Sequence, residues 1–137
     1  MEKKKVAIVT LGDSRREFYK KREAIVASEI EKVKKAFGDK YDLYISPIVF
    51  DTEDGQNISD EIKKQGIEAV IIHVPIWATP SLAFCIAYGT SYPVLLLGNL
   101  QRNTSSLVTL LAVGGMLDQT GKKCIRVSGD YEDPQIQ

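Results

Sequence analysis

The sequence is poor in the residues that build metal and redox sites, with one histidine and two cysteines in 137 residues. A zinc site needs a cluster of His, Cys or carboxylate ligands, which these three scattered residues do not supply. Cys85 and Cys124 each lie in an apolar run without C-x-x-C spacing. We therefore expect buried, reduced thiols, as is usual in a cytosolic protein.

Net charge and long hydrophobic runs are also absent. The 18 Lys and Arg residues balance 18 Asp and Glu residues, so no overall field draws the chain to nucleic acid or to an anionic membrane. Pairs such as Glu17 with Lys21 have the i,i+4 spacing of a solvated helix face rather than of a nucleic-acid patch. The apolar stretch after Lys5 is too short for a signal peptide or a membrane span. These absences favour a cytoplasmic protein that binds neither nucleic acid nor membrane.

Short apolar runs alternate along the chain with segments of helical periodicity. The apolar runs predict five strands, at residues 6–11, 43–50, 69–74, 94–97 and 124–127. The periodic segments predict four helices: residues 14–37, a short helix carrying Ile58 and Ile62, residues 80–87, and a helix from the end of the 98–104 loop to about residue 118. Helical crossovers between strands require a parallel sheet. We therefore expect one α/β domain over residues 1–137, a flavodoxin-like three-layer sandwich with strand order 2-1-3-4-5.

Local signals refine this expectation. Ser14 and Glu17 have the spacing of a capping box, and Gly38 stands where a helix commonly ends. Pro47 interrupts the second strand and predicts an edge position. The acidic residues 51–55 are expected to form a solvated loop, because they lack the alternating oxygen ligands of a calcium site. His73, in an apolar strand, is interpreted as a hydrogen-bonded core residue.

In a parallel sheet of this order, ligands bind beyond the carboxyl ends of the strands, where the strand order reverses. The topology brings two loops there, one carrying Arg15 and Arg16 and one carrying Trp77. An indole face can cover the C–H face of a sugar, while arginine donates hydrogen bonds to hydroxyls or to an anion. Alternatively, Trp77 packs under its own loop and the arginines are solvated.

Three stretches resemble a known family: residues 9–16, residues 73–80, and residues 94–99 together with 114–121. They are similar to the N-terminal domain of the L-fucose isomerase and L-arabinose isomerase family, in its fucose isomerase-like branch. The resemblance covers nearly the whole chain. It implies the N-terminal part of a longer multidomain enzyme that converts an aldose to its ketose with a bound manganese ion. The polar tail at 128–137, with no closing element, is consistent with a connection to a further domain.

The resemblance also implies roles for the three rim residues. Trp77 would stack on the sugar, and Arg15 or Arg16 would hydrogen-bond its hydroxyls, with the sugar bound in a neighbouring subunit of a homo-oligomer. Manganese and the catalytic carboxylates would lie outside this chain, so no catalytic or metal-binding residue is expected here. Two alternatives remain. One is a stand-alone flavodoxin-like module that binds a small ligand or a phosphate through the turn at 12–16. The other is a purely structural interaction domain.

Overall fold

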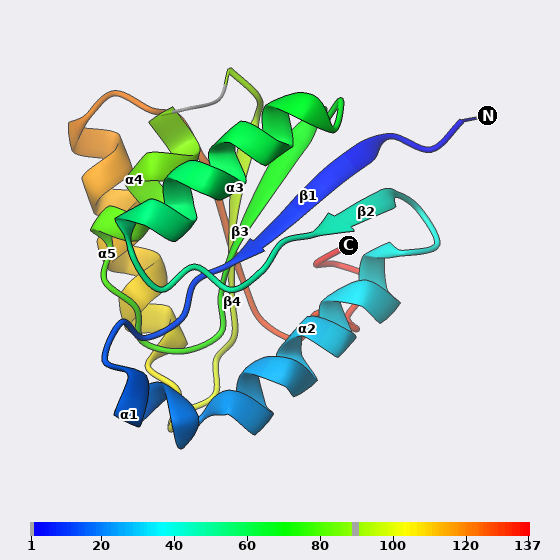
Figure 1. Ribbon diagram of the computed structural model, residues 1–137. Coiled ribbons are helices and arrows are strands. Elements are labelled where there is room, and N and C mark those ends of the chain that lie inside the picture. Colours follow the sequence, from blue (N-terminus) through cyan, green and yellow to red (C-terminus); the bar gives the residue numbers. More distant parts are fainter. Residues whose placement is uncertain (1, 89–90) are drawn as a thin grey trace.

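The computed structural model describes residues 2–88 and 91–137, which form five parallel strands and five helices in these ranges (Figure 1). The strands are β1 (Lys5–Thr10), β2 (Asp42–Ile45), β3 (Ala69–Val74), β4 (Val94–Gly98) and β5 (Ile125–Ser128). The helices are α1 (Arg16–Lys20), α2 (Glu23–Phe37), α3 (Thr52–Lys64), α4 (Ser81–Tyr88) and α5 (Ser106–Gln119).

The strands form one sheet of order β2-β1-β3-β4-β5, and all four pairings are parallel. The predicted fold class and strand order are therefore confirmed. The strand broken by Pro47 lies at an edge, as expected; its regular pairing ends at Ile45, and one further parallel bridge joins Val49 to Leu11. The central strand β3 is buried from Val70 to Val74, which explains why its sequence is an unbroken apolar run apart from His73.

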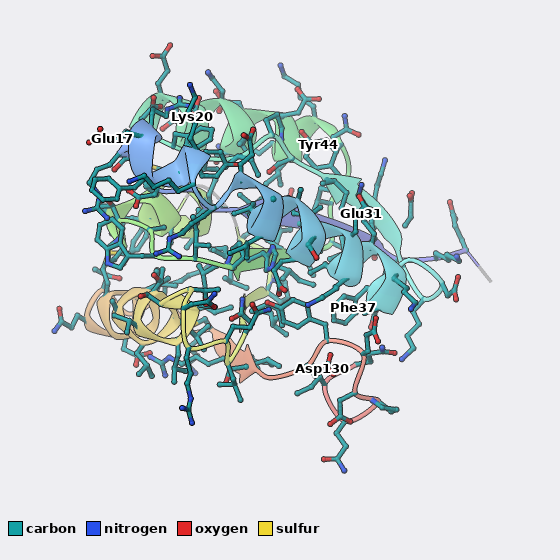
Figure 2. The ribbon with its side chains drawn as sticks, turned by 90° about the horizontal axis from the view of Figure 1, so that it is seen from below. Glu17, Lys20, Glu31, Phe37, Tyr44 and Asp130 are labelled. Carbon is teal, nitrogen blue, oxygen red and sulfur yellow. The ribbon has the colours of Figure 1, made fainter. Side chains whose placement is uncertain are left out.

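Helices α3, α4 and α5 cover one face of the sheet, and α2 together with the C-terminal tail covers the other. Side chains of α3, α4 and α5 pack with Ala7, Val9 and Ile72 in the larger core cluster. On the opposite face, Val33 and Phe37 of α2 pack with Tyr131 of the tail. In Figure 2 the tail around Asp130 runs beside the end of α2. The tail was expected to be polar and without a closing role, but Tyr131 is 1% exposed and completes this second core.

The segment after β1 was predicted as one helix over residues 14–37, and the structure has two. A turn at 21–22 separates the short α1 from α2. The two helices make different contacts: Tyr19 of α1 packs edge-on against Phe50, whereas α2 lies on the sheet. The Ser14–Glu17 capping box is not observed; Asp13 accepts the backbone N–H of Arg15 instead. α2 ends at the predicted place, but Gly38 has an ordinary right-handed backbone.

The acidic residues 51–55 were predicted as a loop, and they are mostly the first turn of α3. Asp51 is the N-cap, and its carboxylate accepts the N–H of Asp54 at 2.8 Å. The Asp54 carboxylate reaches back to the N–H of Phe50 at 2.9 Å. Acidic groups at a helix N-terminus also interact favourably with the helix dipole. The charge run that suggested a loop is thus a helix start.

Two further expectations concern the cysteines and the membrane. Cys85 and Cys124 are free, as predicted, but both are partly exposed rather than sealed in the core. Within the described ranges, every helix is too short or too polar to cross a bilayer.

Candidate functional site

Three loops meet at the carboxyl edge of the sheet, which lies at the bottom of Figure 1 beside α1. They follow β1, β3 and β4, the strands at and next to the reversal of strand order. Ser14 in the first loop has its hydroxyl 3.4 Å from that of Thr79 in the second. The N–H of Trp77 in the second loop donates to the carbonyl of Thr104 in the third at 2.9 Å. The convergence predicted from the topology is therefore observed.

Arg15 and Trp77 are in direct contact at this edge. The guanidinium carbon of Arg15 lies 4.6 Å from the centre of the Trp77 ring and 4.4 Å from that of Phe18. A planar cation between two aromatic rings gains from their negative faces and loses much of its freedom to move. Trp77 is partly exposed, and the Arg15 side chain is 53% exposed. Both groups can therefore be reached by a ligand.

Asp13 fixes the orientation of the Arg15 side chain. Its carboxylate, with a side chain 5% exposed, accepts Nε of Arg15 at 3.0 Å and Nη2 at 2.9 Å. It also accepts the backbone N–H of Arg15 at 3.0 Å. The side-chain hydrogen bond that Arg15 donates to Asp13 raises the pKa of Arg15. The sequence prediction did not include Asp13, although an aspartate in a strand-to-helix turn commonly bonds the backbone two residues on, as in an Asx turn.

Arg16 faces a different part of the surface. Its guanidinium carbon lies 3.6 Å from the centre of the Phe50 ring. The residue lines an open groove of about 620 Å³ between α1 and the segment before α3, together with Tyr19 and Asp54. Glu17 and Lys20, labelled in Figure 2, also belong to α1 and are exposed. The two arginines that the sequence left as alternatives are thus separated, and Arg15 is the one beside Trp77.

His73 is a core residue, as predicted. It is 0% exposed, and its two ring nitrogens lie 3.0 Å from the hydroxyl of Thr10 and 3.3 Å from that of Tyr131. Burial lowers the pKa of His73 to about 3. The imidazole is therefore neutral near pH 7, with one nitrogen donating and the other accepting. It supports the centre of the sheet rather than facing the edge loops.

The described residues bring no three His, Cys, Asp or Glu side chains together in a way that could hold a metal ion. The described residues therefore do not fit a manganese site. What the edge offers is a flat aromatic surface next to a fixed set of hydrogen-bond donors.

Comparison with known proteins agrees with the resemblance seen in the sequence. A family model described as "L-fucose isomerase, first N-terminal domain" matches residues 3–137. A search of curated proteins gives no match.

Proposed function

Because the chain belongs to the family of L-fucose isomerase first N-terminal domains, we propose that it is the substrate-recognition and subunit-contact domain of an aldose–ketose isomerase of carbohydrate metabolism. In this proposal the domain binds and orients the sugar, and other parts of a longer, cytoplasmic enzyme carry out the proton transfer. The manganese ion expected for such an enzyme would be bound outside the described residues, where it would stabilise negative charge that develops on the substrate oxygens.

The observation that carries the proposal is the contact between Arg15 and Trp77 at the carboxyl edge. The indole provides an apolar surface for the C–H face of a sugar, and the guanidinium beside it provides donors for hydroxyl oxygens. Asp13 already balances the charge of Arg15. The pair therefore offers directed hydrogen bonds without a strong net positive charge, which suits a neutral polyol better than a phosphate.

The loop after β1 is poorly suited to the alternative, a phosphate-binding turn at 12–16. Such a turn needs free backbone N–H groups directed at the anion. Here the N–H of Gly12 donates to the carbonyl of Val49 at 2.8 Å, and that of Arg15 donates to Asp13. A side chain at Gly12 would meet Ile48 and Phe50 at 2.8 Å. Close packing therefore explains the glycine without a ligand.

Exposed apolar side chains near the edge support the subunit-contact role. Leu100 in the loop after β4 is 60% exposed, and Val108 and Leu111 on α5 are 59% and 60% exposed. The first two turns of α5 carry no charged side chain. Exposed apolar side chains near a functional edge often mark a protein interface. In a homo-oligomer it would place the Arg15–Trp77 pair beside the sugar of a neighbouring subunit.

The test uses the full-length protein with manganese, and measures ketose formation from L-fucose and L-arabinose. Trp77→Ala should lower kcat/KM by about tenfold or more, equivalent to about 1.4 kcal/mol of transition-state binding. Its manganese content should not change. Trp77→Phe should retain part of the activity because it keeps an aromatic face. Arg102→Ala, an exposed residue in the same group of loops, is the matched control and should behave as wild type.

The proposal fails if Trp77→Ala turns over these sugars as wild type does, or if the full-length protein isomerises neither of them. The 137-residue chain alone should convert no sugar, because it supplies neither the metal nor the acid–base groups.

A further inference from the structure

The backbone of the Trp77 loop is bonded along its length by one other segment of the chain, residues 99–109. The carbonyl of Val74 accepts the hydroxyl of Ser106. The carbonyl of Pro75 accepts the side-chain amide of Asn99 at 3.0 Å. These two bonds hold the loop where it leaves β3.

The remaining bonds hold the loop around the indole itself. The hydroxyl of Thr109 donates to the carbonyl of Ile76 at 3.2 Å and accepts the N–H of Ala78 at 3.1 Å. Between them, the N–H of Trp77 donates to the carbonyl of Thr104 at 2.9 Å. Pro75, Ile76 and Ala78 are buried, where backbone groups need a protein partner, and one segment supplies all five of these bonds.

The side chains that provide this support are buried and are themselves held in place. Asn99, Ser106 and Thr109 are 3%, 0% and 1% exposed. The Asn99 side-chain oxygen accepts the hydroxyl of Thr104 at 3.0 Å, and the Asn99 N–H donates to the hydroxyl of Ser106 at 2.8 Å. A side chain at Gly98 would approach that hydroxyl to 2.9 Å. In a buried network of this kind, removing one partner leaves another polar group unpaired.

From this arrangement we infer that Asn99, Ser106 and Thr109 are positioning residues, which fix the Trp77 loop so that the indole is held ready for the sugar before it binds. The inference rests on the proposed role of Trp77. The bonds of all three side chains to the loop go to its backbone, so they act through the loop backbone. A loop that is already ordered loses less conformational entropy when a ligand binds.

Trp77 is the only tryptophan in the chain, so its fluorescence reports the loop directly and without any sugar. Thr109→Val has almost the same shape but lacks the hydroxyl that bonds Ile76 and Ala78. In this variant, quenching of Trp77 fluorescence by acrylamide should rise about twofold and the anisotropy should fall, as expected for a loop freed from its backbone partners. The far-UV circular dichroism should stay unchanged. Thr109→Ser, which restores a hydroxyl, should restore the wild-type fluorescence.

Two further variants separate positioning from general stability. Ser106→Ala removes the bond to Val74, and it should loosen the indole in the same direction even where Thr109→Val fails to fold. Ser59→Ala, at a buried hydroxyl on α3 for which residues 2–88 and 91–137 supply no hydrogen-bond partner, should leave the fluorescence of Trp77 unchanged. The inference is overturned if folded Thr109→Val or Ser106→Ala shows the quenching and anisotropy of wild type.

Kinetics of the full-length enzyme then distinguish this inference from the proposed function. Thr109→Val should raise KM several-fold with little change in kcat, and Thr109→Ser should reverse the effect. If the indole loosens but Trp77→Ala leaves turnover intact, the positioning inference stands and the sugar-binding role fails. If Trp77→Ala loses activity while the indole of Thr109→Val stays as rigid as in wild type, the sugar-binding role stands and the positioning inference fails.

Discussion

The guanidinium of Arg15 lies 4.6 Å from the ring centre of Trp77, although the two residues follow different strands. The contact exists because β1 and β3 are neighbours in the sheet and both end at the same edge. Arg16, the next residue along the chain, stacks on Phe50 instead. The two adjacent arginines therefore contact different parts of the surface.

This separation predicts unequal effects for the two arginines in the full-length enzyme. Arg15→Ala should lower kcat/KM for the sugar by about tenfold or more, since the hydrogen bonds of one guanidinium are worth about 1.5–3 kcal/mol. Arg16→Ala should change kcat/KM less than about twofold, because its side chain covers Phe50 at the groove beside α1. Steady-state kinetics of both variants provide the measurement. Equal losses in the two variants would contradict the assignment of Arg15.

Asp13 should affect sugar turnover by orienting Arg15 and not by contacting the sugar itself. Asp13→Asn keeps the size of the side chain but loses at least one of the two bonds to the guanidinium, because an amide nitrogen cannot accept. We expect a loss of kcat/KM smaller than that of Arg15→Ala, mainly through KM. In the double variant with Arg15→Ala, the Asp13 change should add little further loss, since the group that it orients is gone. Additive losses would indicate a separate role for Asp13.

The strand positions and the strand order of the sheet could be predicted from the sequence, because its apolar runs and helical crossovers allow few other arrangements. β3 was predicted at residues 69–74 and lies there, since an unbroken apolar run ended by proline suits a strand buried on both faces. Strand order followed from helical crossovers and from the position of Pro47. The same topology predicts that the loops carrying Arg15, Arg16 and Trp77 lie at one edge of the sheet.

The details that were wrong or missed depend on contacts between distant residues. The break between α1 and α2 reflects the packing of Tyr19 on Phe50 and a bond from Arg22 to the carbonyl of Asn103, whereas the hydrophobic periodicity continues through it. Tyr131 resembled part of a polar tail, but its ring fills the space beside α2. The hydrogen-bond network under Trp77 could not be recognised from the sequence, because Ser106 and Thr109 resemble ordinary polar residues at a helix start.

The corrected start of α3 can be checked by its N-cap. Asp51→Ala removes the acceptor of the Asp54 N–H, and should lower the free energy of unfolding by about 1 kcal/mol. Asp51→Asn should retain most of the stability, because asparagine is also a good N-cap. Asp60→Ala, at an exposed position inside the same helix, is the control and should have little effect. Urea denaturation measures the free energy of unfolding of each variant. If Asp51→Ala is as stable as wild type, the first turn of α3 is frayed and the N-cap contributes nothing.

His73 predicts how stability depends on pH. Burial lowers its pKa in the folded chain to about 3 from an ordinary value of 6.5. Between these values the unfolded chain binds a proton that the folded chain does not, so the contribution of His73 is fully present above pH 6.5 and is lost as the pH falls toward 3. The loss is about 1.4 kcal/mol per pH unit. Urea denaturation at several pH values from 7 to 4 should show this slope on top of that from the carboxylates.

A matched pair of variants isolates the histidine. His73→Gln should be less stable at pH 7, because the bonds to Thr10 and Tyr131 are disturbed. Its free energy of unfolding should fall less steeply with decreasing pH than that of wild type, and the difference in slope should correspond to at most one bound proton. Tyr131→Phe removes the hydroxyl that bonds His73 and keeps the buried imidazole, so it should retain most of the wild-type slope. If His73→Gln and wild type lose stability in parallel between pH 6.5 and 4, the imidazole takes up its proton equally well in the folded chain. Its burial would then not be the cause of acid sensitivity.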